Sequence, residues 1–184
     1  MTDFFSIPTR YRGIEFRSRL EARWAMVFDR LGIRWVYEPV LVIIAGRPYL
    51  PDFRLVDCGT WIEVKGDEGR IDRAFLLAAA AELPDAQATS AAGSPSLMIL
   101  GPIPAIPYED FGWLALRAPA DATSVVSMGC AGFGGWAKNR RPWWNCNCQG
   151  FAVGHGGMWT WPCTTADGCS TTQDAYRTAL SSTF

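Results

Sequence analysis

Two carboxylates and an ammonium group come close together in the stretch YLPDFRLVDCGTWIEVKG, residues 49–66. Asp52 follows a proline, and Glu63 and Lys65 come eleven and thirteen residues after it. Turn-forming residues at 57–59 separate two short runs with strand-forming side chains, which predicts a β-hairpin. Such a hairpin would bring Asp52 beside Glu63, and carboxylates that close repel each other unless a cation lies between them.

The residues around Lys65 suggest a functional role for its positive charge. Side chains alternate between the faces of a strand, so Glu63 and Lys65 share one face while Ile62 and Val64 share the other. The chain has fifteen Arg and two Lys, so a basic residue at this position would be expected to be arginine if only its charge mattered. A compact ammonium suits the orientation of a water molecule better than a planar guanidinium does. The alternative is an exposed hairpin that carries a surface Glu and Lys.

The pattern P-D followed by E-x-K resembles the PD-(D/E)XK nuclease superfamily. In that family the two acids hold Mg²⁺ and the lysine positions the attacking water, which implies these roles for Asp52, Glu63 and Lys65. The carbonyl of Val64 would supply a further oxygen. The string FRSRLEARWA, followed by LGIRWVYEP, looks like a phage and actinobacterial branch of the superfamily. The resemblance covers residues 10–101 and implies a deoxyribonuclease that uses Mg²⁺ or Mn²⁺.

Residues 18–31 have the apolar spacing of a helix, with Ser18 as its N-cap and Gly32 just after its end. Glu21 has two interpretations. The sequence Ser-Arg-Leu-Glu is a capping box, in which Glu21 would bind the Ser18 amide. The superfamily also places a third metal-site carboxylate on its first helix, which implies a catalytic role for Glu21. Three arginines off the apolar stripe are candidates for binding nucleic acid: Arg17, Arg19 and Arg23.

The rest of the first 117 residues reads as an α/β core. The pattern predicts strands over 34–44, 49–56 and 61–65, a helix over 71–83, a loop over 85–95, a buried strand over 96–100 and an edge strand over 113–116. The order helix, three-strand antiparallel meander, helix, strand is that of a restriction-endonuclease-like fold. We expect this core, with an extended arm at residues 1–13, to occupy residues 1–117.

The tail, residues 125–184, contains five of the nine Trp, five of the six Cys and half of the Gly. We expect a small Cys/Trp/Gly-rich appendage, which could hardly bury enough surface without a stabilising metal. Four cysteines have a spacing that could bind Zn²⁺: Cys146, Cys148, Cys163 and Cys169. The alternative is a subdomain whose thiols are simply buried. Its basic residues near aromatic side chains predict contacts with nucleic acid: Lys138, Arg140 and Arg141.

The net charge of −1 provides no general attraction to nucleic acid, but the charges are unevenly distributed. Residues 1–35 carry +3, residues 36–124 carry −6 and residues 125–184 carry +2. An acidic middle with basic ends fits a metal site with basic walls, and excesses this small also arise by chance. No signal peptide and no apolar run of membrane-spanning length are evident, which predicts a cytoplasmic protein without a membrane partner.

Together these features predict a Mg²⁺-dependent DNA nuclease for phage or mobile-element DNA processing, recombination or repair. Its partners would be DNA and, in a homodimer or a larger phage or mobile-element assembly, other protein chains. The alternative is a non-catalytic nucleic-acid-binding or assembly protein with a nuclease-like fold and a zinc-type binding module. Metal-dependent cleavage of DNA separates these two hypotheses.

Overall fold

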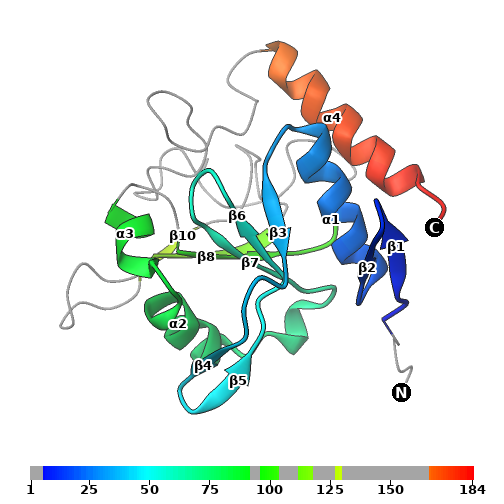
Figure 1. Cartoon of the computed structure of the whole chain (residues 1–184). Coiled ribbons are helices and arrows are strands. Elements are labelled where there is room, and N and C mark those ends of the chain that lie inside the picture. The colour runs from blue at the N-terminus through cyan, green and yellow to red at the C-terminus, as the bar shows by residue number, and fades with distance from the viewer. Residues whose placement is uncertain (1–5, 92–95, 104–111, 118–126, 130–165) are drawn as a thin grey trace.

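The computed structural model describes residues 6–91, 96–103, 112–117, 127–129 and 166–184 (Figure 1). These residues form a mixed α/β structure, in which helices cover both faces of a six-stranded sheet. The helices are α1 (Arg19–Arg30), the 3₁₀ turn η1 (Glu68–Arg70), α2 (Arg73–Glu82), α3 (Ala86–Ala91) and α4 (Ala166–Ser181). None of the helices in the described ranges is long and apolar enough to cross a membrane.

The six-stranded sheet has the order β10-β9-β8-β7-β6-β3. Its strands are β3 (Trp35–Tyr37), β6 (Phe53–Leu55), β7 (Trp61–Val64), β8 (Leu97–Leu100), β9 (Gly112–Arg117) and β10 (Ser127–Gly129). The strands β3, β6 and β7 form an antiparallel meander, and β8 then pairs parallel to β7. The predicted order of helix, three antiparallel strands, helix and strand is therefore present, with α1 before the meander and α2 after it.

The first helix, α1, begins and ends where the sequence predicts. Its N-cap is Ser18, whose Oγ accepts a hydrogen bond from the Glu21 amide at 3.1 Å. Gly32 follows the helix with φ of 68°, a left-handed conformation that glycine adopts without steric strain. In the apolar stripe of α1, Trp24, Val27 and Phe28 are fully buried. The position of Glu21 is therefore fixed at the first turn of a well-anchored helix.

Strand β7 divides its side chains between two hydrophobic clusters. Ile62 and Val64 pack in the cluster that contains the buried face of α1, whereas Trp61 packs with Leu76 of α2. This alternation confirms the prediction that Glu63 faces away from Ile62 and Val64. Because the apolar neighbours of Glu63 are locked on both faces of the sheet, the strand holds its carboxylate in a defined place.

The C-terminal helix, α4, runs alongside α1 (Figure 1). Ala175, Tyr176 and Ala179 are buried in the same cluster as Trp24, and the rings of Trp24 and Tyr176 meet edge to face at 6.3 Å. This helix lies within residues 125–184, for which the sequence predicts an appendage. In the structure the small and aromatic residues of α4 pack against α1 in the main core.

Two segments that the sequence predicts as irregular contain regular structure. The expected N-terminal arm forms a hairpin of β1 (Thr9–Tyr11) and β2 (Ile14–Phe16) that packs on α1. Its turn uses Arg12 and Gly13, whose φ angles of 48° and 83° suit a tight hairpin. The predicted loop at 85–95 contains α3, which begins directly after Asp85.

Two further differences concern the sheets. A hairpin of β4 (Val42–Ile44) and β5 (Arg47–Tyr49) leaves the main sheet between β3 and β6 and contacts α2. The predicted edge strand near residue 113 exists as β9, but β10 pairs with its outer side. Of these, the β4–β5 hairpin matters most for the site described next.

Candidate active site

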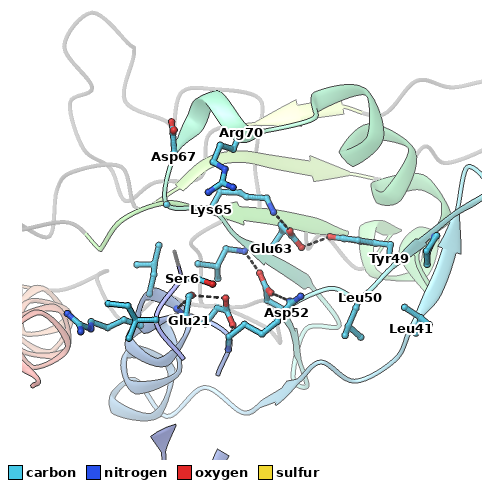
Figure 2. Close-up of a pocket in the computed structure, with 18 residues that line it drawn as sticks. Ser6, Glu21, Leu41, Tyr49, Leu50, Asp52, Glu63, Lys65, Asp67 and Arg70 are labelled. Atoms are coloured by element: carbon cyan, nitrogen blue, oxygen red, sulfur yellow. Dashed lines mark hydrogen bonds and ion pairs between the residues drawn. The ribbon is translucent and has the colours of Figure 1, made fainter. Parts of the chain in front are cut away.

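A groove of about 1450 Å³ lies between the start of α1, the end of β5, the end of β7 and η1 (Figure 2). Three of its lining carboxylates are buried, with exposed fractions of 6%, 3% and 7% for Glu21, Asp52 and Glu63. The basic side chains on its lining are more exposed: Arg17, Arg19, Lys65 and Arg70. The groove thus has an acidic floor, formed by these three carboxylates, and a basic rim, formed by these four cations.

The β6–β7 hairpin brings Asp52 and Glu63 together. Phe53 lies opposite Ile62 in this antiparallel pair, and the same register puts Asp52 opposite Glu63. Burial, and then the charges of Glu63 and Glu21, raise the pKa of Asp52 well above its ordinary value. The part of this shift that comes from Glu63 and Glu21 is charge repulsion, which a bound cation would offset.

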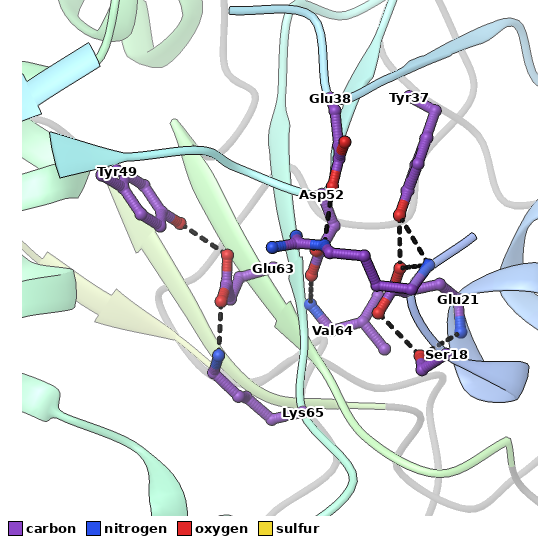
Figure 3. Close-up of polar contacts among 10 residues, drawn as sticks. Ser18, Glu21, Tyr37, Glu38, Tyr49, Asp52, Glu63, Val64 and Lys65 are labelled. Carbon is purple, nitrogen blue, oxygen red and sulfur yellow. Dashed lines mark hydrogen bonds and ion pairs between the residues drawn. The ribbon is translucent and has the colours of Figure 1, made fainter. Parts of the chain in front are cut away.

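Glu63 has a hydrogen-bonding partner on each oxygen (Figure 3). The Nζ atom of Lys65 lies 2.5 Å from Oε1, and the hydroxyl of Tyr49 donates to Oε2 at 2.8 Å. Burial, followed by the charge of Glu63, raises the pKa of Tyr49 well above its ordinary value, so the phenol remains a donor. The sequence does not predict this contact, because nothing in the spacing of Tyr49 shows that β5 brings it close to Glu63 on β7.

The β4–β5 hairpin holds Tyr49 through contacts with α2. The ring of Tyr49 meets Phe75 edge to face at 5.2 Å, and the guanidinium of Arg47 lies over the Phe75 ring, 4.3 Å from its centroid. Arg47 also forms an ion pair of 3.1 Å with Asp72, which is the N-cap of α2. These contacts attach the hairpin to the start of α2 and direct the Tyr49 hydroxyl towards Glu63.

Glu21 lies in the groove with both oxygens already hydrogen-bonded. Oε1 accepts from Ser18 Oγ at 2.6 Å, while Oε2 accepts from the amide of Arg17 at 3.1 Å and from the hydroxyl of Tyr37 at 2.6 Å. Glu21 therefore helps to cap the start of α1, as the capping box predicts. It accepts a hydrogen bond from the Arg17 amide, however, and not from the Ser18 amide. Glu21 could contact a cation directly by giving up one of these donors, or indirectly through a water, and its role as a metal ligand stays a prediction.

Arg17 reaches across the groove to the acidic floor. Its Nη2 atom lies 2.5 Å from Oδ1 of Asp52, and its Nε atom lies 2.6 Å from Oε1 of Glu38. The other oxygen of Asp52, Oδ2, accepts the amide hydrogen of Val64 at 2.6 Å. The sequence predicts Arg17 as a contact to nucleic acid, but it does not predict the ion pair of Arg17 with Glu38. Their contact depends on β3 and α1 meeting at the groove, which no local sequence signal specifies.

Two of the other predicted contacts to nucleic acid, Arg19 and Arg23, lie among the described residues. Arg19 lines the groove, as Arg17 does, whereas Arg23 points to α4 and donates to the carbonyl of Leu180 at 3.3 Å. The remaining predicted residues lie outside the described residues: Lys138, Arg140, Arg141, Cys146, Cys148 and Cys163. Cys169 belongs to α4, but its side chain is not among those described, so the zinc site stays a prediction.

Asp52 and Glu63 are the residues of the acidic floor that could hold a divalent cation such as Mg²⁺. Among the described residues, no three His, Cys, Asp or Glu side chains gather closely enough to form a complete metal cage. Mg²⁺ does not need one, because it keeps several waters and is usually held by one or two carboxylates and by substrate phosphate. Asp52 and Glu63 provide two such carboxylates, and each already has a cationic side chain against one oxygen.

No protein-family model matches this chain, and comparisons with curated proteins and with solved structures give no match either. Its function must therefore be inferred from the groove itself. The relevant features are the paired carboxylates, the lysine bound to one of them and the basic rim around both.

Proposed function

We propose that this chain is a metal-dependent deoxyribonuclease of the PD-(D/E)XK type, with a restriction-endonuclease-like core. Asp52 and Glu63 hold Mg²⁺ or Mn²⁺, and Lys65 orients the attacking water. The observation that carries this proposal is the register of the β6–β7 hairpin, which sets two buried carboxylates side by side at the end of β7. The order of α1, the antiparallel meander, α2 and parallel β8 supports it.

The reaction is the hydrolysis of a phosphodiester bond. Water attacks phosphorus, the bond from phosphorus to the leaving oxygen breaks, and the products are a phosphomonoester and a hydroxyl. A divalent metal would offset charge on the phosphate and lower the pKa of the attacking water. Lys65 donates a hydrogen bond that directs this water, and Glu63 keeps the ammonium in place. Arg19 and Arg70 on the basic rim attract the phosphate backbone.

A second candidate function is non-catalytic binding of nucleic acid by the same fold. It is favoured by the ion pairs of Arg17 with Asp52 and of Lys65 with Glu63, which already balance the carboxylates without a metal. If the ion pair at position 65 were purely structural, however, an arginine would form it equally well, and arginine is far more frequent than lysine in this chain. Nuclease function therefore explains more of the observed arrangement than non-catalytic binding does.

The deciding experiment incubates the purified chain with supercoiled, linear, nicked and branched DNA in Mg²⁺, Mn²⁺, Ca²⁺ or EDTA. We expect cleavage in Mg²⁺ or Mn²⁺ and none in EDTA. Asp52→Asn and Glu63→Gln keep the side-chain shape but remove a ligating charge, so each should abolish cleavage and leave the melting temperature within a few degrees. Asp85→Asn, which removes an exposed carboxylate that pairs with Arg54, is the matched control and should cut normally.

Two results would contradict the proposal. One is cleavage at the wild-type rate by Asp52→Asn or Glu63→Gln. The other is metal-independent DNA binding by the wild-type chain without cleavage of any of the four DNA forms, which would favour the non-catalytic protein.

A further inference from the structure

The guanidinium of Arg17 occupies a position that a cation bound to Asp52 would need. Nη2 of Arg17 lies 2.5 Å from Oδ1 of Asp52, while Oδ2 of the same carboxylate accepts the Val64 amide at 2.6 Å. Asp52 thus has one oxygen held by the backbone of β7 and the other held by a side chain. Because side chains change rotamer far more readily than a sheet changes register, a metal ion would compete with Arg17 for Oδ1.

Arg17 is fixed at its backbone but not along its side chain. Its amide contacts Oε2 of Glu21 at 3.1 Å and the hydroxyl oxygen of Tyr37 at 3.0 Å, which anchors the residue just before α1. The side chain is 53% exposed, in contrast to 4% for that of Asp52. The charged end of Arg17 can therefore turn into the groove without leaving a buried cavity behind it.

Glu38 provides a second contact for the same guanidinium. Oε1 of Glu38 lies 2.6 Å from Nε of Arg17, and the Glu38 amide donates to the carbonyl of Asp52 at 2.9 Å. Glu38 has φ of 43°, a left-handed conformation that is uncommon for a residue other than glycine. This backbone conformation places a carboxylate beside Arg17 and next to Asp52, so the guanidinium has a partner at the groove when it leaves Asp52.

We propose that Arg17 is a substrate-positioning residue that changes partners: it neutralises Asp52 in the metal-free protein, and a divalent cation at Asp52 releases it to bind a phosphate of the nucleic acid. This proposal rests on the nuclease function proposed above. The exchange couples the two ligands, because the metal frees Arg17 for the phosphate and the phosphate keeps Arg17 away from Asp52. Such coupling is reciprocal, so each ligand strengthens the binding of the other by the same factor.

The first part of the test measures Mn²⁺ affinity without nucleic acid, from the electron paramagnetic resonance signal of free Mn²⁺. Arg17→Gln removes the competing cation, so it should bind Mn²⁺ about tenfold more tightly than the wild-type chain. Arg17→Lys keeps a charge but cannot contact two carboxylates in the same way, so its affinity should lie between these values. Arg34→Gln removes the same charge from an exposed ion pair with Asp57 and should leave the affinity unchanged.

The second part measures binding of a fluorescent duplex DNA by anisotropy, in Ca²⁺ and in EDTA. Arg17→Gln should weaken binding about tenfold in Ca²⁺, beyond any change caused by Arg34→Gln. In EDTA the DNA affinities of Arg17→Gln and Arg34→Gln should differ little, because in the wild-type chain Arg17 then contacts Asp52 rather than phosphate. A structural ion pair would not produce this dependence on the metal.

The outcomes separate this inference from the nuclease proposal. Unchanged Mn²⁺ affinity in both Arg17 variants overturns the exchange, and so does an equal loss of DNA affinity in Ca²⁺ and in EDTA. If such a protein still binds Mn²⁺ and cuts DNA, the nuclease proposal survives alone. If the wild-type chain binds no Mn²⁺, both proposals fail. Near-ultraviolet circular dichroism checks the fold, and Arg17→Lys decides the test if Arg17→Gln does not fold.

Discussion

Tyr49 donates its hydroxyl hydrogen to Oε2 of Glu63 at 2.8 Å, and the residue is only 8% exposed. The contact leaves Oε1 of Glu63 for Lys65 and fixes the rotation of the carboxylate. Loss of a hydrogen-bonding partner behind a metal ligand typically costs about 10- to 100-fold in metal affinity or activity. Tyr49 is therefore a positioning residue for Glu63 in the proposed reaction.

Tyr49→Phe should consequently reduce cleavage at low Mg²⁺ by about tenfold, with partial recovery at high Mg²⁺. It should also lower the free energy of unfolding by about 1–2 kcal/mol, because a buried carboxylate loses a donor. Cleavage rates across a Mg²⁺ titration check the first effect, and urea unfolding checks the second. Tyr11→Phe, which removes a hydroxyl bonded to Asp29 outside the groove, is the control. Equal Mg²⁺ dependence in all three proteins would show that Tyr49 has no influence on the metal site.

The meeting of Asp52 and Glu63 could be predicted from the sequence because it depends on local rules. A turn at 57–59 and alternation along two short strands are enough to set the hairpin register. The start of α1 follows equally local rules, since the N-cap Ser18 and the bond from its side chain lie within one turn of helix. Neighbouring residues therefore determine both the Asp52–Glu63 pairing and the start of α1, which is why the sequence predicts these two features.

The pH dependence of stability offers a test of the acidic floor. Burial and the charges of Glu63 and Glu21 raise the pKa of Asp52 well above 3.8, although the Val64 amide and Arg17 act in the opposite direction. Between 3.8 and the raised value, the folded protein keeps a proton that the unfolded chain has lost. The free energy of unfolding of the metal-free protein should therefore fall as the pH rises through this window.

Urea unfolding in EDTA at several pH values measures this fall. Asp52→Asn should reduce it, because the neutral side chain does not titrate. Asp57→Asn is a control of opposite sign, since the hydrogen bond from Arg34 lowers the pKa of Asp57 and that contribution is lost as the pH falls. Mg²⁺ should restore stability at the upper end of the window, because it binds the folded state. If the free energy of unfolding of Asp52→Asn fell by the same amount over this pH window, groups other than Asp52 would be the cause.

Glu21→Gln tests whether the third carboxylate contributes charge as well as hydrogen bonds. The amide group can point at Ser18, whose Oγ can accept a hydrogen bond, so the melting temperature should stay within a few degrees. Loss of the negative charge should weaken the attraction for a cation and reduce cleavage by about tenfold, mostly through a higher Mg²⁺ requirement. Wild-type cleavage at every Mg²⁺ concentration would limit Glu21 to its role at the helix start.

Contacts between distant segments explain what the sequence did not predict. Arg23 and Leu180 are 157 positions apart, yet they meet because α4 packs along α1. Tyr49 likewise depends on the hairpin docking against α2, and Arg17 depends on β3 bringing Glu38 to the groove. No periodic pattern or motif encodes such meetings, because each results from the packing of several elements at once.

Lys65 allows the sharpest distinction between chemistry and simple charge. Its ammonium lies 2.5 Å from Oε1 of Glu63, and its side chain is 31% exposed, so it can both pair with the carboxylate and reach the groove. Lys65→Arg keeps the charge but replaces a compact donor with a planar fork, whereas Lys65→Met keeps most of the stem without the charge. If Lys65 only balanced Glu63, the Arg variant would cut almost normally and the Met variant would not.

We expect both Lys65 variants to lose about 10²-fold or more in kcat, because a group that directs the attacking water acts in the transition state. The values of kcat and kcat/KM should fall together, while DNA binding in Ca²⁺ should change little. Arg70→Gln on the basic rim provides the contrast: it should weaken DNA binding and reduce its salt dependence, with kcat nearly unchanged. Single-turnover cleavage and anisotropy measure these quantities on the same preparations. A Lys65→Arg variant that cuts at the wild-type rate would return Lys65 to the role of a counter-ion, since its positive charge alone would then account for its effect.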